Sequence, residues 1–472
     1  MLLNFIDEDK AEELDYLFGG RLEWVTHLKE VLGIDIEPTT EYGRYFSKGR
    51  NNSYKFVPLA VANDIMSKHP TIYCEGSGFF IYENGVYRQG REMFLHQKIQ
   101  ELLGFEATNQ RVLEVIGQIK RSKVLSEDVF NKVPLLNLKN GSLDVASGEF
   151  YPHSPTNYTT IQLPIMYDPN ADCPNIKKFI NEIVAADTVP ILEEWFAYCM
   201  FPTTKYEKAI MLTGTGANGK SVLMNLFKYF IGKENLSHND LQDFERRFTT
   251  ANLYGKLANT SADLPSCALK DTGIFKKIVA GDDLQAEYKG LNSFTFTPYA
   301  RLMFSANELP ASADLSEGFF RRWIIINFPN IFSGQNADPN LLEKLTTSQE
   351  LSGLLNLALQ AWDRLNKQGG FTTNADTKKT LNDYKRANDK VLQFIEEECV
   401  ISETAKVSKS GLYRAYNEWC KLSGYKALGQ HKFYQSLQLK GFKSDTVRVD
   451  GKRAFSGIGF SIQSEFSAFR KW

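Results

Sequence analysis

The sequence predicts an α/β protein in three parts: a phosphate-loop (P-loop) domain built on a parallel sheet, a small α+β module before it and a winged helix after it. Residues 205–330 alternate strand and helix patterns, which is typical of a parallel sheet. Residues 61–165 combine two hairpin patterns with helical periodicity. From residue 390 onward the pattern indicates three helices followed by a hairpin.

Length and composition limit the classes of protein that are possible. The 472 residues predict roughly two to four domains, and a 43% hydrophobic content supplies their cores. A net charge of −1 excludes a uniformly basic chain, so the distribution of charge along the chain is more informative than the total. The six cysteines form no CxxC pair and lack histidines at ligand spacing, which argues against a zinc site and a disulfide framework. No apolar run is long enough to span a membrane, so we expect a cytoplasmic protein without a membrane partner.

Shifts in composition divide the chain into four ranges. The turn-rich stretch "YDPNADCPN", residues 167–175, marks a boundary, and the polar stretch 372–389 joins two domains. The expected ranges are an N-terminal extension 1–60, the α+β module 61–165, the P-loop domain with a helical collar 166–372, and the winged helix 386–472.

The α+β module is predicted from its turns. In "GFFIYENGVYRQG", residues 78–90, Asn84 and Gly85 supply the positive φ angles of a tight hairpin turn. Helical periodicity and a second hairpin follow in the ranges 93–104, 110–122 and 135–155.

The stretch "AIMLTGTGANGKSVLMNLF", residues 209–227, contains a P-loop. Its "GTGANGKS" matches G-x-x-x-x-G-K-[ST], in which glycines let backbone N–H groups curl around phosphates. Lys220 would place a charge on the β- and γ-phosphates, and the Ser221 hydroxyl would bind Mg²⁺. A strand before the motif and a helix after it distinguish it from a chance match. The expected nucleoside-triphosphate site comprises Gly214, Thr215, Gly216, Ala217, Asn218, Gly219, Lys220 and Ser221.

Polar side chains follow two further strands of the predicted sheet. Asp263 ends the strand pattern 255–263, where an acid can hold the Mg²⁺ water shell and polarise the attacking water; the alternative is an aspartate that caps a turn. Asn307 ends the strand pattern 299–307 and could orient water against the γ-phosphate; the alternative is again a cap.

A pair of arginines precedes the last core strand, residues 321–328. Arg321 and Arg322 could reach a neighbouring subunit's nucleotide as an arginine finger. Surface ion pairing is an equally good reading of these two residues.

The order of P-loop, acid, basic hairpin, strand-tip asparagine and arginine pair resembles superfamily 3 helicases, the hexameric replicative ATPases of viruses, phages and plasmids. From about residue 60 to 470 the chain is similar to phage and plasmid primase-helicases of the poxvirus-type primase-helicase family. The similar stretches are "LLNLKNGSLDVASGEFYPHSP", "GTGANGKS", "IFKKIVAGDDLQAEYKGLNSFTFTPYARLMFSANELP" and "GFFRRWIIINFP".

The resemblance implies an AAA+-like ATPase domain that uses ATP and Mg²⁺. Within it Asp263 would be the Walker B acid that contributes to the metal site, and Asn307 the sensor. Arg322 would be the arginine finger, with Arg321 a close second. Lys289, in "EYKGLNSF", would lie on a hairpin that lines a central pore and grips DNA phosphate, although the residue alone reads as a solvated lysine.

Two departures from the family pattern stand out. The family often has two adjacent acids in its Walker B strand, whereas Ala262 precedes Asp263 here. Only about 60 residues precede the α+β module, too few for a primase core, so we expect a helicase without a primase domain.

The C-terminal range carries the local positive charge that the neutral total conceals. Residues 400–472 contain nine lysines and four arginines against two aspartates and three glutamates. Asp450-Gly451 suits the turn of a wing, and the helix 429–441 would be the recognition helix. The residues expected to face DNA are Gln430, Lys432, Gln435, Lys440, Lys452 and Arg453. The alternative is an interaction domain without a DNA role.

We therefore expect an ATP-driven, ring-forming DNA helicase that unwinds DNA during the replication of a phage, plasmid or related mobile element in the cytoplasm of a bacterial host. Its expected partners are single-stranded and forked DNA, further copies of itself in a hexamer, origin DNA and a separate primase. The resemblance implies 3′ to 5′ movement. One alternative is an origin-binding initiator whose ATPase mainly drives assembly on DNA, and another is an ATPase that does not act on DNA.

Overall fold

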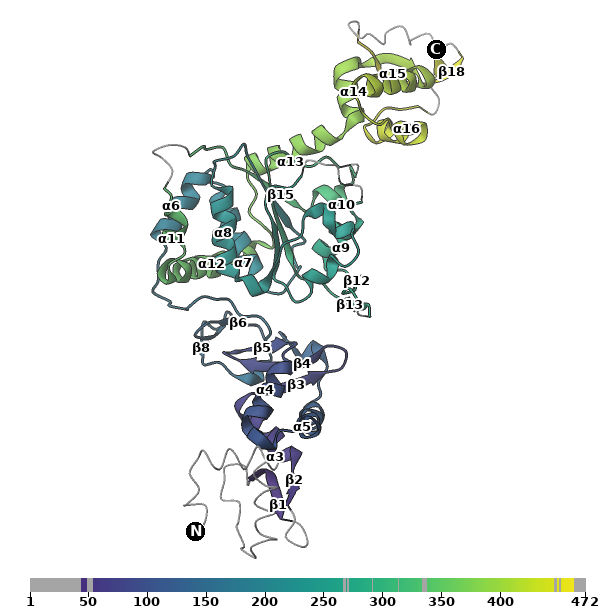
Figure 1. The fold of residues 1–472 in the computed structure, drawn as a ribbon. Helices are drawn as coiled ribbons and strands as arrows, with labels where there is room; N and C mark the ends of the chain where they lie inside the picture. Colours follow the sequence, from purple (N-terminus) through teal and green to yellow (C-terminus); the bar gives the residue numbers. More distant parts are fainter. Residues whose placement is uncertain are drawn as a thin grey trace, which may run out of the picture. The chain divides into compact units, whose positions relative to one another are not determined.

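The computed structural model describes residues 44–48, 54–265, 269, 271–290, 292–312, 314–332, 338–444, 448–449 and 451–461 (Figure 1). The chain forms two compact units, Met1–Ala171 with Leu351–Leu355 and Asp172–Glu350 with Asn356–Trp472. Most of the expected N-terminal extension, residues 1–60, lies outside the described residues, as does Asp450 of the expected wing turn. Within the described ranges, no helix combines the length and apolar character needed to cross a membrane.

The first unit holds an antiparallel sheet covered by three helices. The hairpin turn lies at Asn84 (φ 50°) and Gly85 (φ 86°), which confirms the tight turn predicted there. The sheet consists of β3 (Thr71–Cys74), β4 (Gly78–Glu83) and β5 (Val86–Gln89). The helices are α3 (Pro58–Lys68), α4 (Glu92–Leu103) and α5 (Asn109–Ser122), and they share one apolar core with β4.

Two smaller antiparallel sheets complete this unit. The first pairs β1 (Phe46–Lys48) with β2 (Tyr54–Phe56). The second contains β6 (Leu135–Leu138), β7 (Gly141–Asp144) and β8 (Phe150–Tyr151), as the second predicted hairpin requires.

The second unit is built on a five-stranded parallel sheet, which confirms the predicted α/β class. Its strands, in spatial order, are β10 (Leu236–Ser237), β11 (Ala258–Ser261), β14 (Arg301–Ala306), β9 (Ala209–Thr213) and β15 (Trp323–Asn327). Because all five strands run the same way, the segments that follow β9, β11 and β14 meet at one edge of the sheet.

Helices cover both faces of this sheet, as parallel sheets require. Figure 1 shows α7 and α8 on one side of the strands and α9 and α10 on the other. The elements are α6 (Pro174–Ile183), α7 (Val189–Cys199), α8 (Lys220–Ile231), α9 (Gly273–Ala280), α10 (Glu317–Phe320), α11 (Leu341–Leu345) and α12 (Ser348–Gln368).

Strand β11 is polar in sequence yet fully buried. Asn259 is 0% exposed, and its amide is satisfied on every side: Oδ1 accepts from the Ser237 hydroxyl (2.9 Å) and the Asn239 N–H (2.8 Å), and Nδ2 donates to the Asn239 carbonyl (2.8 Å). Buried amides are tolerated when they are hydrogen-bonded in this way. The polar residues therefore fix β11 to the loop after β10 instead of weakening the strand.

A hairpin projects between β11 and β14. It pairs β12 (Leu284–Ala286) with β13 (Phe294–Phe296), and Tyr288 stacks on Phe294 with ring centroids 5.5 Å apart. Lys289 lies exposed at its tip.

The C-terminal part contains the predicted helices and hairpin, together with a strand that the pattern did not predict. The polar stretch 372–389 is mostly helix α13 (Ala375–Asn388), whose Tyr384 hydroxyl donates to the Pro310 carbonyl (2.7 Å). The other elements are α14 (Lys390–Glu398), β16 (Cys399–Ser408), α15 (Lys409–Leu422), α16 (Gln430–Leu439), β17 (Arg448–Val449) and β18 (Lys452–Phe460). The unpredicted strand β16 pairs with β18 and is mostly exposed, so it lacks the alternation of a half-buried strand.

Candidate nucleotide-binding site

The P-loop joins β9 to α8, and its glycines are required by close backbone packing. Gly214 has φ 150°, and a Cβ there would meet Asn218 Nδ2 at 2.3 Å and the Phe328 carbonyl at 2.8 Å. Gly219 has φ 88°, and a Cβ there would meet Ile183 at 2.6 Å. A side chain at Gly214 would collide with Asn218 and Phe328, and one at Gly219 would push the loop away from α6, so both glycines keep the loop in this conformation.

Lys220 begins α8 and is only 4% exposed. Its Nζ donates to the Gly214 carbonyl (2.5 Å), to Asn218 Oδ1 (3.1 Å) and to Asn307 Oδ1 (3.4 Å). Burial lowers the pKa of Lys220, and the charge of Asp263 opposes that shift. All three acceptors are neutral, so an anion that entered here would find a buried ammonium whose charge is incompletely compensated.

Asn218 supplies a second donor at the same place. Its side chain is 3% exposed, and its Nδ2 has no hydrogen-bond partner among the described atoms. A buried donor without a partner is costly, and a phosphate oxygen would satisfy it. The loop therefore fits the phosphates of a nucleoside triphosphate.

Asp263 and Asn307 reach the same edge from neighbouring strands. Asp263 follows β11 in a left-handed conformation (φ 55°), and the next N–H, of Leu264, donates to the Ser305 carbonyl of β14 (2.9 Å). Asn307 follows β14 and contacts Lys220 directly. The structure thus brings together the acid, the asparagine and the lysine that the sequence pattern placed far apart.

These groups line one cavity of about 630 Å³, a volume that suits a nucleotide. Its apolar wall comes from Phe179 and Ile183 of α6, Phe332 after β15 and Leu341 of α11. The P-loop residues from Gly216 to Ser221, with Asp263 and Asn307, form the polar wall. The apolar residues carry no motif and lie outside the P-loop, so no sequence pattern could have identified them.

The donors for a magnesium ion are Ser221 and Asp263, both of which line this cavity. Among the described residues, no group of three or more His, Cys, Asp or Glu side chains could hold a metal. Mg²⁺ commonly takes only one or two protein oxygens and completes its shell with waters and substrate phosphates. The residues present fit that mode of binding.

The two arginines lie at the opposite edge of the sheet. They immediately precede β15, whose first residue pairs with Ala209 at the start of β9, whereas the P-loop follows the end of β9. The five-residue strand separates the two edges by about 17 Å, at ~3.3 Å per residue. Arg321 and Arg322 therefore cannot reach the P-loop of their own subunit. Their side chains are 50% and 10% exposed, and both pair with Glu207.

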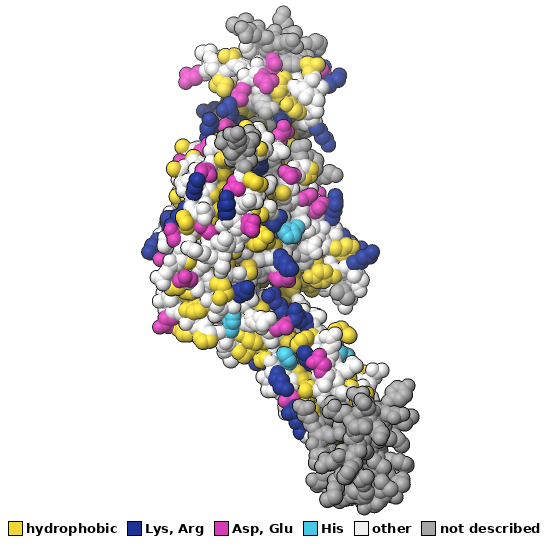
Figure 2. Space-filling model, turned by 60° about the vertical axis from the view of Figure 1, so that its left-hand side comes forward, with side chains coloured by type: hydrophobic (Ala, Val, Ile, Leu, Met, Phe, Trp, Pro, Cys, Tyr) yellow, Lys and Arg dark blue, Asp and Glu magenta, His cyan; other side chains and the backbone are white. Residues whose placement is uncertain are grey.

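The C-terminal part exposes only some of the side chains predicted to face DNA. Lys432, Gln435, Lys452 and Arg453 are exposed. Gln430 is exposed too, and it donates to the Tyr434 hydroxyl (2.8 Å). One expectation needs correction: Lys440 is half-buried and forms an ion pair with Asp389, so it is not a free lysine. On the face shown in Figure 2, Lys and Arg side chains of the central domain are interspersed with Asp and Glu.

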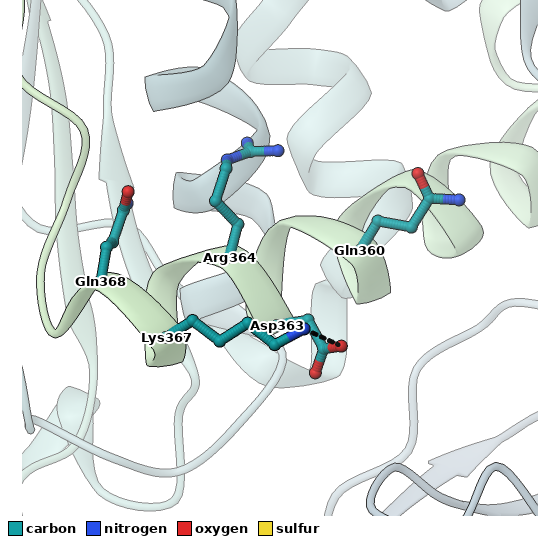
Figure 3. Close-up of a pocket in the computed structure, with 5 residues that line it drawn as sticks. All are labelled: Gln360, Asp363, Arg364, Lys367 and Gln368. Carbon is teal, nitrogen blue, oxygen red and sulfur yellow. Dashed lines mark ion pairs between the residues drawn. The ribbon is translucent and has the colours of Figure 1, made fainter.

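A separate hollow lies on α12 and is not a ligand site of the same kind. Figure 3 shows Arg364 pointing away from Lys367 and Asp363, which pair with each other (3.6 Å). Arg364 is held by Glu193 (3.0 Å) and Glu194 (2.9 Å). The charges that line the hollow are therefore matched by side chains of the protein itself.

Protein-family models match three ranges of the chain. A model described as "D5 N terminal like" matches residues 61–185, and one described as "Poxvirus D5 protein-like" matches residues 386–453. A "Family of unknown function (DUF5906)" matches residues 212–322, which contain the P-loop, Asp263, Asn307 and the arginine pair.

Two curated viral proteins are similar in sequence to part of this chain. The chain is 26% identical over 321 residues to "Putative helicase L207/L206" of Acanthamoeba polyphaga mimivirus, covering 61% of this chain and 33% of that protein. It is 25% identical over 263 residues to "Putative helicase 121R" of Invertebrate iridescent virus 3, covering 52% and 28%. The chain thus spans about a third of the length of these relatives.

The fold is similar to that of the NrS-1 C terminal region in its apo form. One such structure gives a TM-score of 0.53 at 13% identity, and another gives 0.50 at 14%. Each likeness covers 85% of this chain and 99% of the other. At these identities the similarity concerns the fold alone.

Proposed function

Because the chain belongs to the superfamily 3 primase-helicase-type family of phages and viruses, we propose that it is an ATP-dependent DNA helicase that acts in the replication of a viral, phage or plasmid genome. The observation that carries this proposal is the convergence of Lys220, Asp263 and Asn307 on one cavity beside the P-loop. A P-loop alone supports nucleotide binding, whereas an acid and an asparagine beside it support hydrolysis.

The residues of the cavity have distinct roles in this proposal. The backbone N–H groups of the P-loop and the Nδ2 of Asn218 bind the phosphates, and Lys220 neutralises the β- and γ-oxygens. Ser221 and Asp263 hold Mg²⁺, which supplies charge stabilisation on the phosphates when bound. Asn307 orients the attacking water, and its hydrogen bond to Lys220 keeps both groups in register.

Ring formation is supported by the position of the arginine pair. The pair lies at the edge of the sheet that faces away from the subunit's own P-loop. An arginine that acts on phosphate must then act on a nucleotide held by another subunit. We propose a closed ring of identical subunits, a hexamer by the family resemblance, with each nucleotide bound between two of them.

DNA would be bound at two places. Lys289, exposed at the tip of the β12–β13 hairpin, would contact the phosphates of one strand as the ring moves. The C-terminal part would bind duplex DNA through Lys432 on α16 and through Lys452 and Arg453 on β18, in the manner of a winged helix.

The exposed basic residues of α16 and β18 also favour a second candidate, an origin-binding initiator whose ATPase mainly drives assembly. An initiator would bind one duplex sequence far more tightly than random duplexes of the same length. Competition binding at a fixed salt concentration distinguishes it from a helicase that binds duplexes of different sequence with similar affinity.

Unwinding of forked duplexes tests the main proposal. Substrates with a single 3′ tail, a single 5′ tail or both are incubated with the protein, ATP and Mg²⁺, and Lys220→Ala serves as the inactive control. We expect ATP-dependent strand separation that requires a 3′ tail. Full ATPase activity that ignores single-stranded DNA and never separates strands would favour an ATPase with another substrate.

A further inference from the structure

One carboxylate holds both arginines at the edge of the sheet away from the P-loop. Glu207 lies in the turn before β9 with φ 47°, and its N–H donates to the Thr204 carbonyl (2.8 Å). Its Oε2 lies 2.7 Å from an Nη2 of Arg321 and 3.3 Å from an Nη2 of Arg322. A non-glycine residue in this conformation stores backbone strain, so the turn is held by its surroundings.

The backbone that carries this cluster is fixed from both strands. The Ala209 N–H donates to the Arg322 carbonyl (2.8 Å), and Lys208 Nζ donates to the Arg321 carbonyl (2.5 Å). The parallel pairing of β9 with β15 therefore sets the distance between Glu207 and the two guanidiniums. The fold therefore fixes the backbone positions of the residues that make the contact.

The two arginines have different surroundings. Arg322 is buried, its Nη1 donates to the Gly318 carbonyl, and its Nε has no partner among the described atoms. The Arg321 side chain is 50% exposed, and only its Nη2 is engaged by Glu207. A guanidinium has further N–H donors in the same plane, so Arg321 can bind Glu207 and still present donors outward.

Three cations, Lys208, Arg321 and Arg322, stand around the Glu207 carboxylate. Burial lowers the pKa of Lys208 and of Arg322, and the charge of Arg321 lowers both further, whereas Glu207 opposes both shifts, helped by Glu317 at Lys208 and by Asp282 at Arg322. Arg321 is the exposed member of the three, so an additional anion would meet it first, and the phosphates of the subunit's own nucleotide lie at the far edge.

We propose that Glu207 is a positioning residue that orients Arg321 toward a phosphate bound by the neighbouring subunit, while Arg322 braces the carboxylate from the buried side. The proposal rests on the shared nucleotide site described above. Arg321 is then the residue that reaches across the interface. The family resemblance ranked Arg322 before Arg321 as the arginine finger, whereas the greater exposure of Arg321 favours the opposite order.

Glu207→Gln tests this role because it removes the charge while keeping the size of the side chain. The Glu207–Arg321 pair is exposed and contributes little to stability, and the amide oxygen of the variant can still accept from the buried Arg322, so the melting temperature should fall by no more than about 4 °C from that of the unaltered full-length protein. The kcat for ATP hydrolysis should fall about tenfold to 100-fold, with the KM for ATP nearly unchanged, because a misplaced arginine acts on the transition state. Glu207→Asp, which keeps the charge, should recover part of the rate.

Glu317→Gln is the matched control. Glu317 lies in α10, four residues before Arg321, is 73% exposed and pairs with Lys385, so its loss should leave the kcat unchanged. An equal loss of kcat in Glu207→Gln and Glu317→Gln would overturn the proposal, since it would reflect a general effect of charge near α10.

Mixing variants tells a role at the interface from a role within one subunit. Lys220→Ala has a defective P-loop and an intact arginine pair, whereas Glu207→Gln has an intact P-loop and a misplaced arginine. A mixture of the two should regain ATP hydrolysis at the interfaces where Glu207→Gln supplies the P-loop and Lys220→Ala supplies the arginine pair. A mixture of Glu207→Gln with Arg321→Ala should regain none, because both lack the same half.

The outcomes separate this inference from the proposed function. If Lys220→Ala and Arg321→Ala fail to restore each other, the shared site is wrong and the role of Glu207 falls with it. If that mixture is active but Glu207→Gln hydrolyses ATP at the normal rate, or is restored by Arg321→Ala, only the inference about Glu207 is overturned.

Discussion

The Nζ of Lys220 lies 3.4 Å from the Oδ1 of Asn307, a residue 87 positions further along the chain. The contact exists because β9 and β14 are adjacent parallel strands, so the segments that follow them begin side by side. It links the group proposed to neutralise phosphate charge to the group proposed to orient water. In that proposal, a single hydrogen bond couples nucleotide binding to hydrolysis.

Lys220→Ala should abolish ATP hydrolysis. The variant loses the buried ammonium at the P-loop and leaves three acceptors, Gly214, Asn218 and Asn307, without their donor. Loss of such an electrostatic contact costs at least about 100-fold in kcat. Phosphate release from the purified variant measures this, and turnover at the normal rate would refute the assignment of the P-loop.

Asn307→Ala should separate binding from hydrolysis. Lys220 keeps two of its acceptors in this variant, so the affinity for ATP, measured with a fluorescent nucleotide, should change by less than about threefold. The kcat should fall about tenfold to 100-fold, because the water is no longer oriented. A variant that binds ATP weakly but hydrolyses it at an undiminished kcat would show that Asn307 supports only the P-loop and does not orient water.

Much of this site was predictable because its residues follow strands. The strand patterns placed β9, β11, β14 and β15 correctly, and parallel topology then brings the residues that follow β9, β11 and β14 to one edge. The roles assigned to these residues stay predictions. Glu207 was missed because nothing in its neighbourhood marks it: its partners lie 114 positions or more away, and only the pairing of β9 with β15 brings them together.

The departures from the sequence reading have a common cause in tertiary contact. Lys440 reads as a free lysine at the end of a helix, yet Asp389 from a distant segment neutralises it. Strand β16 is mostly exposed at the edge of its sheet, so it has no apolar alternation and is defined by its backbone pairing with β18. Patterns of single segments cannot report partners that come from elsewhere in the chain.

Lys289→Ala should uncouple ATP hydrolysis from unwinding. The side chain is exposed at the tip of the β12–β13 hairpin, far from any contact that holds the fold, so the basal ATPase should be retained. Loss of one phosphate contact should reduce the slope of log K against log salt for single-stranded DNA by about 0.7. Lys277→Ala, an exposed lysine on α9, is the control and should leave both the salt slope and unwinding unchanged. Normal unwinding by Lys289→Ala would remove the hairpin from the mechanism.

Glu194→Ala should destabilise the second unit. This fully buried carboxylate accepts hydrogen bonds from Arg364 (2.9 Å), Gln368 (2.9 Å), and the Thr372 N–H and hydroxyl (2.8 and 2.7 Å), which join α7 to α12 and the segment after it. Its loss removes the shared acceptor of these partly buried hydrogen bonds, at a cost of about 1–3 kcal/mol in the free energy of unfolding.

Glu194→Gln should be destabilising as well, because the amide places its NH₂ group, a donor, where the carboxylate had an acceptor oxygen, and two donors then face each other. Asp363→Asn is the matched control: it lies on α12 next to Arg364, is 67% exposed, and its ion pair with Lys367 should contribute less than about 1 kcal/mol. Thermal melting of the three variants measures the difference. A stable Glu194→Ala protein would mean that water satisfies the exposed donors.

Asp314 should make the stability of the segment before the arginine pair depend on pH. Its carboxylate accepts from the Thr272 hydroxyl, Lys276 Nζ (2.9 Å) and the Ser316 N–H (2.9 Å). These hydrogen bonds outweigh its burial and lower the pKa of Asp314 well below the ordinary value of 3.8. Because the folded pKa is the lower one, the contribution is complete above about pH 4, the unfolded value, and is lost as the pH falls through the folded value.

Asp314→Asn keeps the shape of the side chain and removes this dependence. Near pH 7 the variant should be less stable than the unaltered protein by about 1.5–3 kcal/mol, the range for hydrogen bonds to a charged group. The difference should persist to pH 5 and narrow as the pH is lowered toward 3, because the aspartate of the unfolded chain then binds a proton while the folded one stays charged, which stabilises the unfolded state. Denaturant midpoints at each pH measure it, and Asp363→Asn, with its exposed carboxylate, controls for the removal of one negative charge. A difference that stays constant from pH 7 to pH 3 would show that Asp314 acts through packing, with no contribution from its charge.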